Sequence, residues 1–278
     1  MVEGSCLCGA VRWQLEGPFE WMAHCHCSRC RKAHGTAFAT YLASPAAGFS
    51  CSGVENVGCY QAEGGGPRCF CKTCGSVVPS GATGASVYSP AGNLLSDPEV
   101  RPQAHMFVGS KAPWYAITDD LPRFEAFPPG VDAKVLPDRE PIDPPDHTRG
   151  SCLCGAVAFV VDGPPQIARY CHCGRCRRAR SAAHASNLVT SARTVRFTRG
   201  ADQLGAFKVP DARFFLQVFC RHCGGPMPRI DEGREIAVIP MGSLDDDPGM
   251  SPSVHIHVGS KAPWFSIADG LVQHEEVG

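Results

Sequence analysis

A pattern of three closely spaced cysteines occurs twice in this chain and strongly limits how it can fold. It reads Cys-His-Cys-Ser-Arg-Cys at residues 25–30 and Cys-His-Cys-Gly-Arg-Cys at residues 171–176. A closed structural zinc site takes four protein ligands, whereas a site that keeps one position open takes three. Three soft ligands without an obvious fourth therefore suggest a metal site that carries chemistry.

Four sequence patterns recur in the same order, so the chain is a duplicated domain. The length of 278 residues also exceeds the roughly 100–200 residues of one average domain. The matching pairs are residues 4–11 and 150–157, 25–30 and 171–176, 71–75 and 220–224, and 108–114 and 258–264.

The segment between the two copies is rich in proline and poor in apolar residues. Its prolines include Pro137, Pro141, Pro144 and Pro145. Sequence of this kind forms an extended, semi-rigid linker. We therefore expect a first domain at residues 1–130, a linker at 131–147 and a second domain at 148–278.

Inside each copy the hydrophobic period is two, which is typical of half-buried strands. Val11, Trp13 and Leu15 alternate with polar residues, and the second copy repeats the alternation at residues 157–161. Further β-rich runs lie at residues 213–219, 236–239 and 255–258. Helix is expected only as a short turn at residues 29–33. The fold class predicted is mainly β, with each domain held together by metal.

The overall composition excludes several classes of partner. The chain has 26 basic and 27 acidic residues, a formal net charge of −1, which does not suit nucleic-acid binding. The first residues show neither the basic nor the apolar region of a signal peptide, and no apolar run is long enough to cross a bilayer. We therefore expect a cytoplasmic protein that binds no nucleic acid and no membrane.

The cysteine count is high for a reducing compartment. Of 17 cysteines, two matching sets of seven fall into the repeated patterns, which indicates metal ligands rather than disulfides. Cys51, Cys59 and Cys69 have no counterparts in the second copy and are interpreted as packing thiols.

The outer cysteines of each copy combine a Cys-x-Cys turn with a Cys-x-x-Cys-Gly knuckle. Four thiolates of this kind complete a closed tetrahedral zinc site. Four unliganded thiols are the weaker interpretation, because both patterns recur together. The predicted structural ligands are Cys6, Cys8, Cys71 and Cys74, and Cys152, Cys154, Cys220 and Cys223.

The inner cysteines are predicted to hold a second zinc with an open position. Three thiolates give Zn²⁺ a net charge of −1, which makes it a poor activator of water and better suited to a soft thiol. Two questions stay open from the residues alone. Arg31, Lys32, Arg177 and Arg178 either neutralise the site or form a solvated face, and the recurring His105 and His255 are either remote ligands or packed side chains. The predicted inner ligands are Cys25, Cys27 and Cys30, and Cys171, Cys173 and Cys176.

The repeated Gly-Ser-Lys-Ala-Pro-Trp sequence also has two interpretations. Lys111 and Lys261 can face an anionic substrate or cap the surface, and the two tryptophans are interpreted as core residues.

Four segments together resemble the family of glutathione-dependent formaldehyde-activating enzymes, also called the GFA or centromere protein V domain. They are GSCLCGAV, CHCSRCRKAHGTAF, FCKTCGS and HMFVGSKAPWYAITDDLPRFEAF, and both halves of the chain match. The resemblance implies a β-tent fold, a structural zinc on the eight outer cysteines, one for each copy, and a catalytic zinc on each inner cluster. Up to four zinc ions per chain are expected. The second copy departs from the pattern where Arg180-Ser181 replace His34-Gly35.

The resemblance also implies an activity. The family joins formaldehyde and glutathione to give S-hydroxymethylglutathione, so the leading hypothesis is a zinc-dependent carbon–sulfur lyase that acts on a thiol adduct of a small aldehyde or other electrophile. Its partner would be a small thiol such as glutathione. Because thiols add to aldehydes readily without a catalyst, the substrate can be a different adduct. The alternatives are a non-catalytic zinc module that binds a protein or a thiol, and a redox protein that cycles its inner cysteines.

Overall fold

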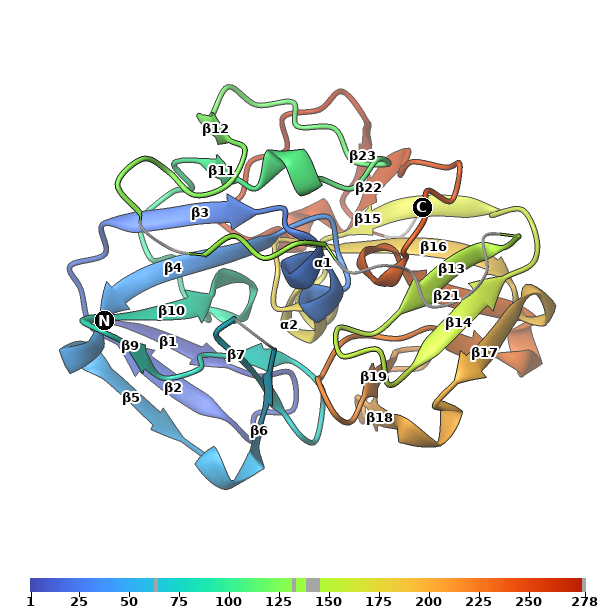
Figure 1. The fold of residues 1–278 in the computed structure, drawn as a ribbon, viewed down its shortest axis with the longest axis horizontal. Coiled ribbons are helices and arrows are strands. Elements are labelled where there is room, and N and C mark those ends of the chain that lie inside the picture. The colour runs from blue at the N-terminus through green and yellow to red at the C-terminus, as the bar shows by residue number, and fades with distance from the viewer. Residues whose placement is uncertain (63–64, 132–133, 139–145, 277–278) are drawn as a thin grey trace.

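A computed structural model describes residues 1–62, 65–131, 134–138 and 146–276 (Figure 1). The fold is mainly β, as the sequence predicts, and two α-helices occur in the described part of the chain. They are α1 (Ser28–His34) and α2 (Gly174–Arg180), of seven residues each. No helix among the described residues has the length and apolar character needed to cross a membrane.

The strands of the first half form three sheets. In hydrogen-bonded order, the first sheet is β1 (Val2–Ser5), β2 (Arg12–Leu15) and β5 (Phe49–Ser52). The second is β12 (Arg123–Phe124), β11 (His105–Met106), β3 (Trp21–Cys25), β4 (Ala39–Pro45), β10 (Ser86–Pro90) and β9 (Ala82–Thr83). The third is β6 (Val57–Gln61), β7 (Pro67–Cys71) and β8 (Val77–Val78).

The second half repeats this order. Its first sheet is β13 (Thr148–Ser151), β14 (Ala158–Val161) and β17 (Val195–Arg199). Its second is β20 (Arg229–Asp231), β21 (Ile236–Pro240), β16 (Ala185–Ser191), β15 (Ile167–Cys171), β22 (Val254–Ile256) and β23 (Val272–His274), and its third is β18 (Leu204–Lys208) with β19 (Leu216–Cys220). The duplication seen in the sequence is therefore a duplication of topology.

The two halves lie side by side, and α1 and α2 lie at the centre between them (Figure 1). Each helix packs against a 3₁₀ turn of the opposite half: α1 against η8 (Met241–Ser243) and α2 against η3 (Ala91–Asn93). A Cβ on Gly92 would lie 2.0 Å from the amide nitrogen of Ala182, and one on Gly242 would lie 2.3 Å from that of Thr36. Glycine is required at both contacts because the two backbones meet there.

The apolar side chains of both halves form one continuous core. It contains the tryptophans Trp13 and Trp114 of the first half and Phe159 and Trp264 of the second. The core interpretation of the two Pro-Trp tryptophans is therefore confirmed. The division at residues 130 and 148 remains a prediction, but the halves are packed together as well as joined by a linker.

Three local expectations need correction. β19 begins at Leu216, so residues 213–215 of the expected run lie outside the strand, and β22 ends at Ile256 rather than at residue 258. All four residues of β14 are buried, whereas β2 alternates as predicted. The alternation in residues 157–161 therefore misses that β14 is covered on both faces.

The interpretation of Cys59 and Cys69 as separate packing thiols is wrong. They occupy directly paired positions on the antiparallel strands β6 and β7, with Cα atoms 4.0 Å apart, and form a disulfide. Cys51 remains a half-buried free thiol, and burial raises its pKa. Residue spacing alone does not indicate the pairing, because the register of β6 against β7 is a tertiary property.

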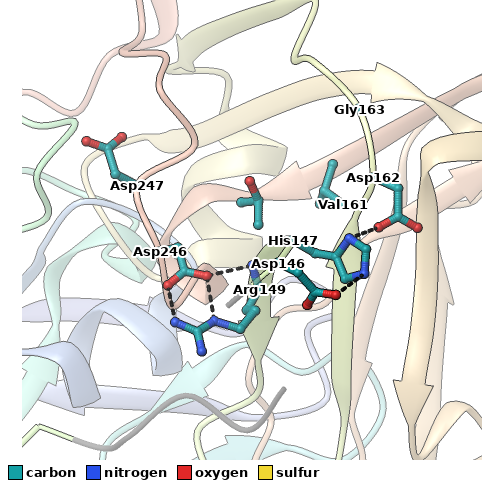
Figure 2. A pocket seen from close by; sticks show the side chains of 9 residues that line it. Asp146, His147, Arg149, Val161, Asp162, Gly163, Asp246 and Asp247 are labelled. Atoms are coloured by element: carbon teal, nitrogen blue, oxygen red, sulfur yellow. Dashed lines mark hydrogen bonds and ion pairs between the residues drawn. The ribbon is translucent and has the colours of Figure 1, made fainter. Parts of the chain in front are cut away.

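The end of the linker is anchored by ion pairs at the start of the second half (Figure 2). His147 lies 2.7 Å from Asp162, and the guanidinium of Arg149 binds Asp246 at 2.7 Å and 2.8 Å. These residues line an open pocket of about 630 Å³ that no cysteine lines. This pocket is therefore separate from the cysteine clusters. The expected linker residues Pro141, Pro144 and Pro145 lie outside the described residues.

Candidate metal centres and the pocket beside them

The outer cysteines converge in both halves as the sequence predicts. In the first half Cys6 and Cys8 come from the turn between β1 and β2, and their Sγ atoms are 3.5 Å apart. Cys8 Sγ lies 3.6 Å from that of Cys71, and all four sulfurs of Cys6, Cys8, Cys71 and Cys74 lie within 4.8 Å of one another. The corresponding distances in the second half, from Cys154 to Cys152 and to Cys220, are 3.4 Å and 3.7 Å.

These distances suit a tetrahedral ion. A Zn–S bond of about 2.3 Å gives a tetrahedron whose S···S edges are about 3.8 Å. Backbone amides of Val11 and Val157 donate to the sulfurs of Cys6 and Cys152 at 3.3 Å, which favours the thiolate form. Each outer cluster can therefore hold a metal ion in a closed site.

The inner cysteines are brought together by the junction between a strand and a short helix. Cys25 ends β3, Cys27 is the N-cap of α1, and Cys30 lies in the first turn. The Cys27 sulfur accepts a hydrogen bond from the amide of Cys30 at 3.4 Å, in place of the usual serine or aspartate cap. The Sγ atoms of Cys25 and Cys27 are 3.6 Å apart, again close to a tetrahedral edge. In the second half β15 and α2 place Cys171, Cys173 and Cys176 in the same way, and each inner cluster contains three cysteines among the described residues.

A pocket of about 960 Å³ lies against the first inner cluster. The side chains of Cys25, Cys27 and Cys30 line it. Most of its remaining wall is apolar and aromatic, and includes Trp21, Tyr41, Tyr88, Met106, Phe107 and Phe127. The three sulfurs thus face a space large enough for an organic ligand rather than the closed protein interior.

One cation lies against the inner cysteines of the first half. Arg68, on β7, is 3.8 Å from the Cys30 sulfur through Nη2 and also lines the pocket. The negative charge of Cys30 raises the pKa of Arg68, so this guanidinium stays protonated. Arg68 was not singled out from the sequence, because it follows a glycine-rich segment and is far from the cluster along the chain.

Tyr41 and His34 form a hydrogen-bonded pair at the pocket wall. His34 Nε2 is 2.9 Å from the Tyr41 hydroxyl, and His34 Nδ1 is 2.8 Å from the backbone carbonyl of Arg180 in the second half. Because a carbonyl only accepts, Nδ1 carries the proton and Nε2 accepts from Tyr41. Burial lowers the pKa of His34 to about 4 and raises that of Tyr41, so both are neutral at pH 7.

The second half has different residues at the matching positions. Arg180 replaces His34 at the end of the helix, and Asn187 replaces Tyr41 on the strand after it. Gln217 replaces Arg68. The Tyr–His pair and the Arg–Cys contact are thus features of the first half.

His105 and His255 are packed side chains that belong to hydrogen-bonded chains. His105 Nδ1 is 2.8 Å from His26 Nε2, and its Nε2 is 2.8 Å from Asp119. Burial lowers the pKa of His26 to about 3. The second half repeats this arrangement with Asp269, His255 and His172. These histidines lie behind the inner cysteines and support the strand on which the first of them sits.

The basic residues after the inner clusters are placed differently from either expectation. Lys32 lies 2.6 Å from Asp245, and Arg178 donates to Ser5 at 3.2 Å, so both are directed into the opposite half. Arg31 donates to the carbonyl of His26 at 3.3 Å and Arg177 to that of Ser260 at 3.1 Å. None of the four is a solvated face or a side chain bonded to an inner sulfur in the described contacts.

Lys111 and Lys261 cap their own turns. Lys111 Nζ donates to the carbonyl of Tyr115 at 2.6 Å, and Lys261 Nζ to that of Phe265 at 2.7 Å. Their ammonium groups are therefore used locally, which supports the capping interpretation over contact with a substrate.

A duplicated β fold with paired clusters of four and three cysteines defines a class of cysteine-rich metal-binding proteins. Within that class, the profile of the glutathione-dependent formaldehyde-activating enzyme family matches residues 1–110 and 147–260. The chain therefore belongs to this family, and the resemblance seen in its sequence is confirmed.

Individual relatives match over shorter stretches. A Halomonas elongata protein that carries the name of a glutathione-dependent formaldehyde-activating enzyme is 39% identical over 85 residues, which is 28% of this chain and 54% of that protein. An uncharacterised lyase of Schizosaccharomyces pombe is 34% identical over 82 residues, or 27% of this chain and 54% of that protein. The matches span about half the length of these relatives.

Among solved structures, a Rhodobacter sphaeroides protein aligns over 97% of its own chain and 37% of this one, at 27% identity and a TM-score of 0.30.

Proposed function

We propose that this protein is a zinc-dependent carbon–sulfur lyase that makes or breaks the bond between a thiol of the glutathione type and a carbonyl compound. The observation that carries the proposal is the position of Cys25, Cys27 and Cys30, whose three sulfurs line a pocket of about 960 Å³. Family membership and the names of the two relatives support the reaction class.

The inner cysteines of the first half would hold the zinc. The three sulfurs suit the ion in number, spacing and softness, and a bound zinc would supply an electrophilic position that stabilises a substrate thiolate. Arg68 adds a fixed positive charge beside Cys30 and opposes the build-up of negative charge when a fourth thiolate arrives. The outer clusters would hold structural zinc.

Tyr41 and His34 are suited to handle the proton of the adduct. In the lyase direction the C–S bond breaks and its electron pair stays on sulfur, while the hydroxyl proton leaves and a C=O bond forms. The Tyr41 oxygen accepts that proton as its own proton moves to His34 Nε2, which is free to accept because Nδ1 is committed to the carbonyl of Arg180. The reverse sequence makes the adduct.

The size and lining of the pocket bear on the electrophile. Its wall is largely apolar, and Trp21, Phe107 and Phe127 contribute aromatic rings. Formaldehyde would leave most of that apolar surface without a contact, whereas a carbonyl compound with an apolar body would bury it at roughly 25 cal/mol per Å². We therefore favour adducts of apolar aldehydes over the formaldehyde adduct.

The proposal is tested by exchange NMR on the zinc-loaded full-length protein. Glutathione is equilibrated with butanal or with formaldehyde, and the rate at which adduct and free aldehyde interconvert is measured with and without protein. We expect acceleration, larger for butanal. Tyr41→Phe should reduce it about 100-fold, as the loss of a proton-transfer group does, with little effect on thiol binding.

Tyr60→Phe is the control, because Tyr60 lies on β6 and is not part of the pocket wall. If the protein binds glutathione but accelerates neither exchange, the non-catalytic thiol-binding module replaces the lyase. If zinc is lost on mild oxidation with formation of inner disulfides, the redox alternative is favoured.

A further inference from the structure

The inner cysteine cluster of the second half is surrounded by a different set of side chains. The strand registers match, since Tyr41 pairs with Ala23 on β3 as Asn187 pairs with Arg169 on β15. By the same correspondence Gln217 stands for Arg68 and Arg229 for Ser80. Tyr41, Arg68 and Ser80 all line the pocket of the first half. Asn187, Gln217 and Arg229 therefore occupy the positions that face the ligand space in the second half.

Several polar groups in this set are buried without a hydrogen-bond partner. Arg180 is 9% exposed and Gln217 only 2%. Arg180 Nη1 donates to Gln217 Oε1 at 2.9 Å, which places the two side chains in contact. The remaining donors Arg180 Nε, Gln217 Nε2 and Arg229 Nε lack partners. A buried donor without a partner is costly, so such groups mark the place of an absent acceptor.

The two guanidinium groups also act on each other. Burial lowers the pKa of Arg180 to about 10, the charge of Cys176 raises it, and Arg229 lowers it further. Burial likewise lowers the pKa of Arg229, and Cys176 acts to raise it. Among the described residues neither arginine forms an ion pair with a carboxylate. Two neighbouring, desolvated cations favour the arrival of an anion.

Neutralisation of the cysteine cluster alone does not explain this arrangement. The first half places one guanidinium, that of Arg68, directly on a cysteine sulfur. In the second half Arg180 is directed to Gln217 and Arg229 to the carbonyl of Phe214. In the described part of the second half, no arginine hydrogen bond to Cys176 takes the place of the Arg68 contact.

We propose that Arg180, Arg229 and Gln217 form an anion-binding subsite beside the inner cysteines of the second half, which takes the carboxylate of a thiol-bearing ligand. Guanidinium and amide N–H groups match the two oxygens of a carboxylate. The nearby cluster takes the thiol, and this part of the inference rests on the proposed function. The two halves then differ in role: the first handles an apolar adduct and the second recognises an anionic thiol.

The test is isothermal titration calorimetry of the zinc-loaded full-length protein with three probes. They are 3-mercaptopropionate, which has both groups, 3-mercapto-1-propanol, which has the thiol without the charge, and propionate, which has the charge without the thiol. We expect 3-mercaptopropionate to bind at least 10-fold more tightly than 3-mercapto-1-propanol at a site that depends on the arginines.

The variants replace each arginine by the residue found at the matching position of the first half. Arg229→Ser and Arg180→His should each weaken 3-mercaptopropionate about 10-fold and leave 3-mercapto-1-propanol unchanged. Arg180→His retains the backbone carbonyl that orients His34. Arg234→Ser is the control, because it removes an equal charge from the exposed turn beside β20. Thermal unfolding of each variant establishes that it is folded.

The outcomes separate the two proposals. If 3-mercaptopropionate and 3-mercapto-1-propanol bind equally and both arginine variants behave as wild type, the carboxylate subsite is overturned while thiol binding stands. If 3-mercapto-1-propanol fails to bind but propionate binds in an Arg229-dependent manner, the subsite stands and the thiol site of the proposed function fails. If no probe binds, both are overturned.

Discussion

Lys32 Nζ lies 2.6 Å from Asp245 Oδ1, and both side chains are almost completely buried. Lys32 belongs to the helix that carries Cys30, whereas Asp245 follows η8 of the second half. The same ammonium group also donates to Ser151 at 3.0 Å and 3.1 Å and to the Ser243 carbonyl at 3.3 Å. The inner metal helix of one half is thereby bonded to the other half.

Removal of Asp245 should destabilise the whole chain. Asp245→Leu introduces the residue found at the matching position of the first half, Leu95, and leaves the Lys32 charge buried without a counter-charge. We expect a loss of about 3 kcal/mol in the free energy of unfolding. Urea unfolding measures it, and the double variant Lys32→Met/Asp245→Leu should recover most of the loss.

An exposed ion pair gives the matched control for this effect. Asp97 and Arg101 are 2.8 Å apart at the surface. Asp97→Asn should cost no more than about 1 kcal/mol. An equal loss for Asp97→Asn and Asp245→Leu would show that burial at the junction of the halves is not what makes the Lys32 pair important.

Gly75 should tolerate no side chain. It adopts φ +73°, and a Cβ there would lie 2.5 Å from the ring of Phe219 in the opposite half. Gly84 has a similar φ of +62°, but a Cβ at that position would meet nothing within 4 Å. Gly75→Ala should therefore cost at least about 2 kcal/mol more than Gly84→Ala in thermal or urea unfolding, because only the former adds a steric clash to the backbone strain. Equal costs would mean that the contact across the halves relaxes freely.

Loss of an outer cysteine should differ from loss of an inner one. Cys74→Ser breaks a closed four-sulfur cluster in the core, so we expect a large drop in Tm and loss of the cooperative transition. Cys30→Ser should leave Tm within a few degrees of wild type and remove one zinc. Elemental analysis should give close to four zinc ions for wild type, one for each cluster. A wild-type value near two would restrict zinc to the outer clusters and contradict the catalytic-zinc proposal.

His184 should make the protein sensitive to mild acid. It is fully enclosed between Phe38, Tyr170 and Phe265, and burial holds its pKa well below 6.5. The unfolded chain binds a proton at this histidine below pH 6.5 and the folded chain does not, so stability falls as pH drops through that value, at about 1.4 kcal/mol per pH unit.

His184→Phe introduces the residue at the matching position of the first half, Phe38, and should remove this contribution. Between pH 6.5 and 5.5 the variant should lose about 1 kcal/mol less than wild type in urea unfolding. His222→Gln at the surface is the control. If both variants follow the wild-type pH dependence, other buried histidines or the cysteine clusters account for the acid sensitivity.

The sequence by itself determined the features that depend on local spacing. Repetition revealed the duplication, alternation revealed the strand content, and the spacing of the cysteines revealed which of them converge. The clusters at Cys6 and at Cys25 were predictable because a metal site needs several soft ligands, and turns of the Cys-x-Cys and Cys-x-x-Cys type bring them close in any fold.

The tertiary structure alone decided what surrounds those clusters. Arg68 reaches Cys30, Cys59 pairs with Cys69, and His34 bonds to Arg180 because of strand register and of the packing of one half on the other. Lys32 shows the same limit, since its position after the inner cysteines suggested a role at the metal and its side chain is held in the opposite half instead. Contacts between residues far apart in the chain depend on packing geometry, which hydrophobic pattern and residue type do not encode locally.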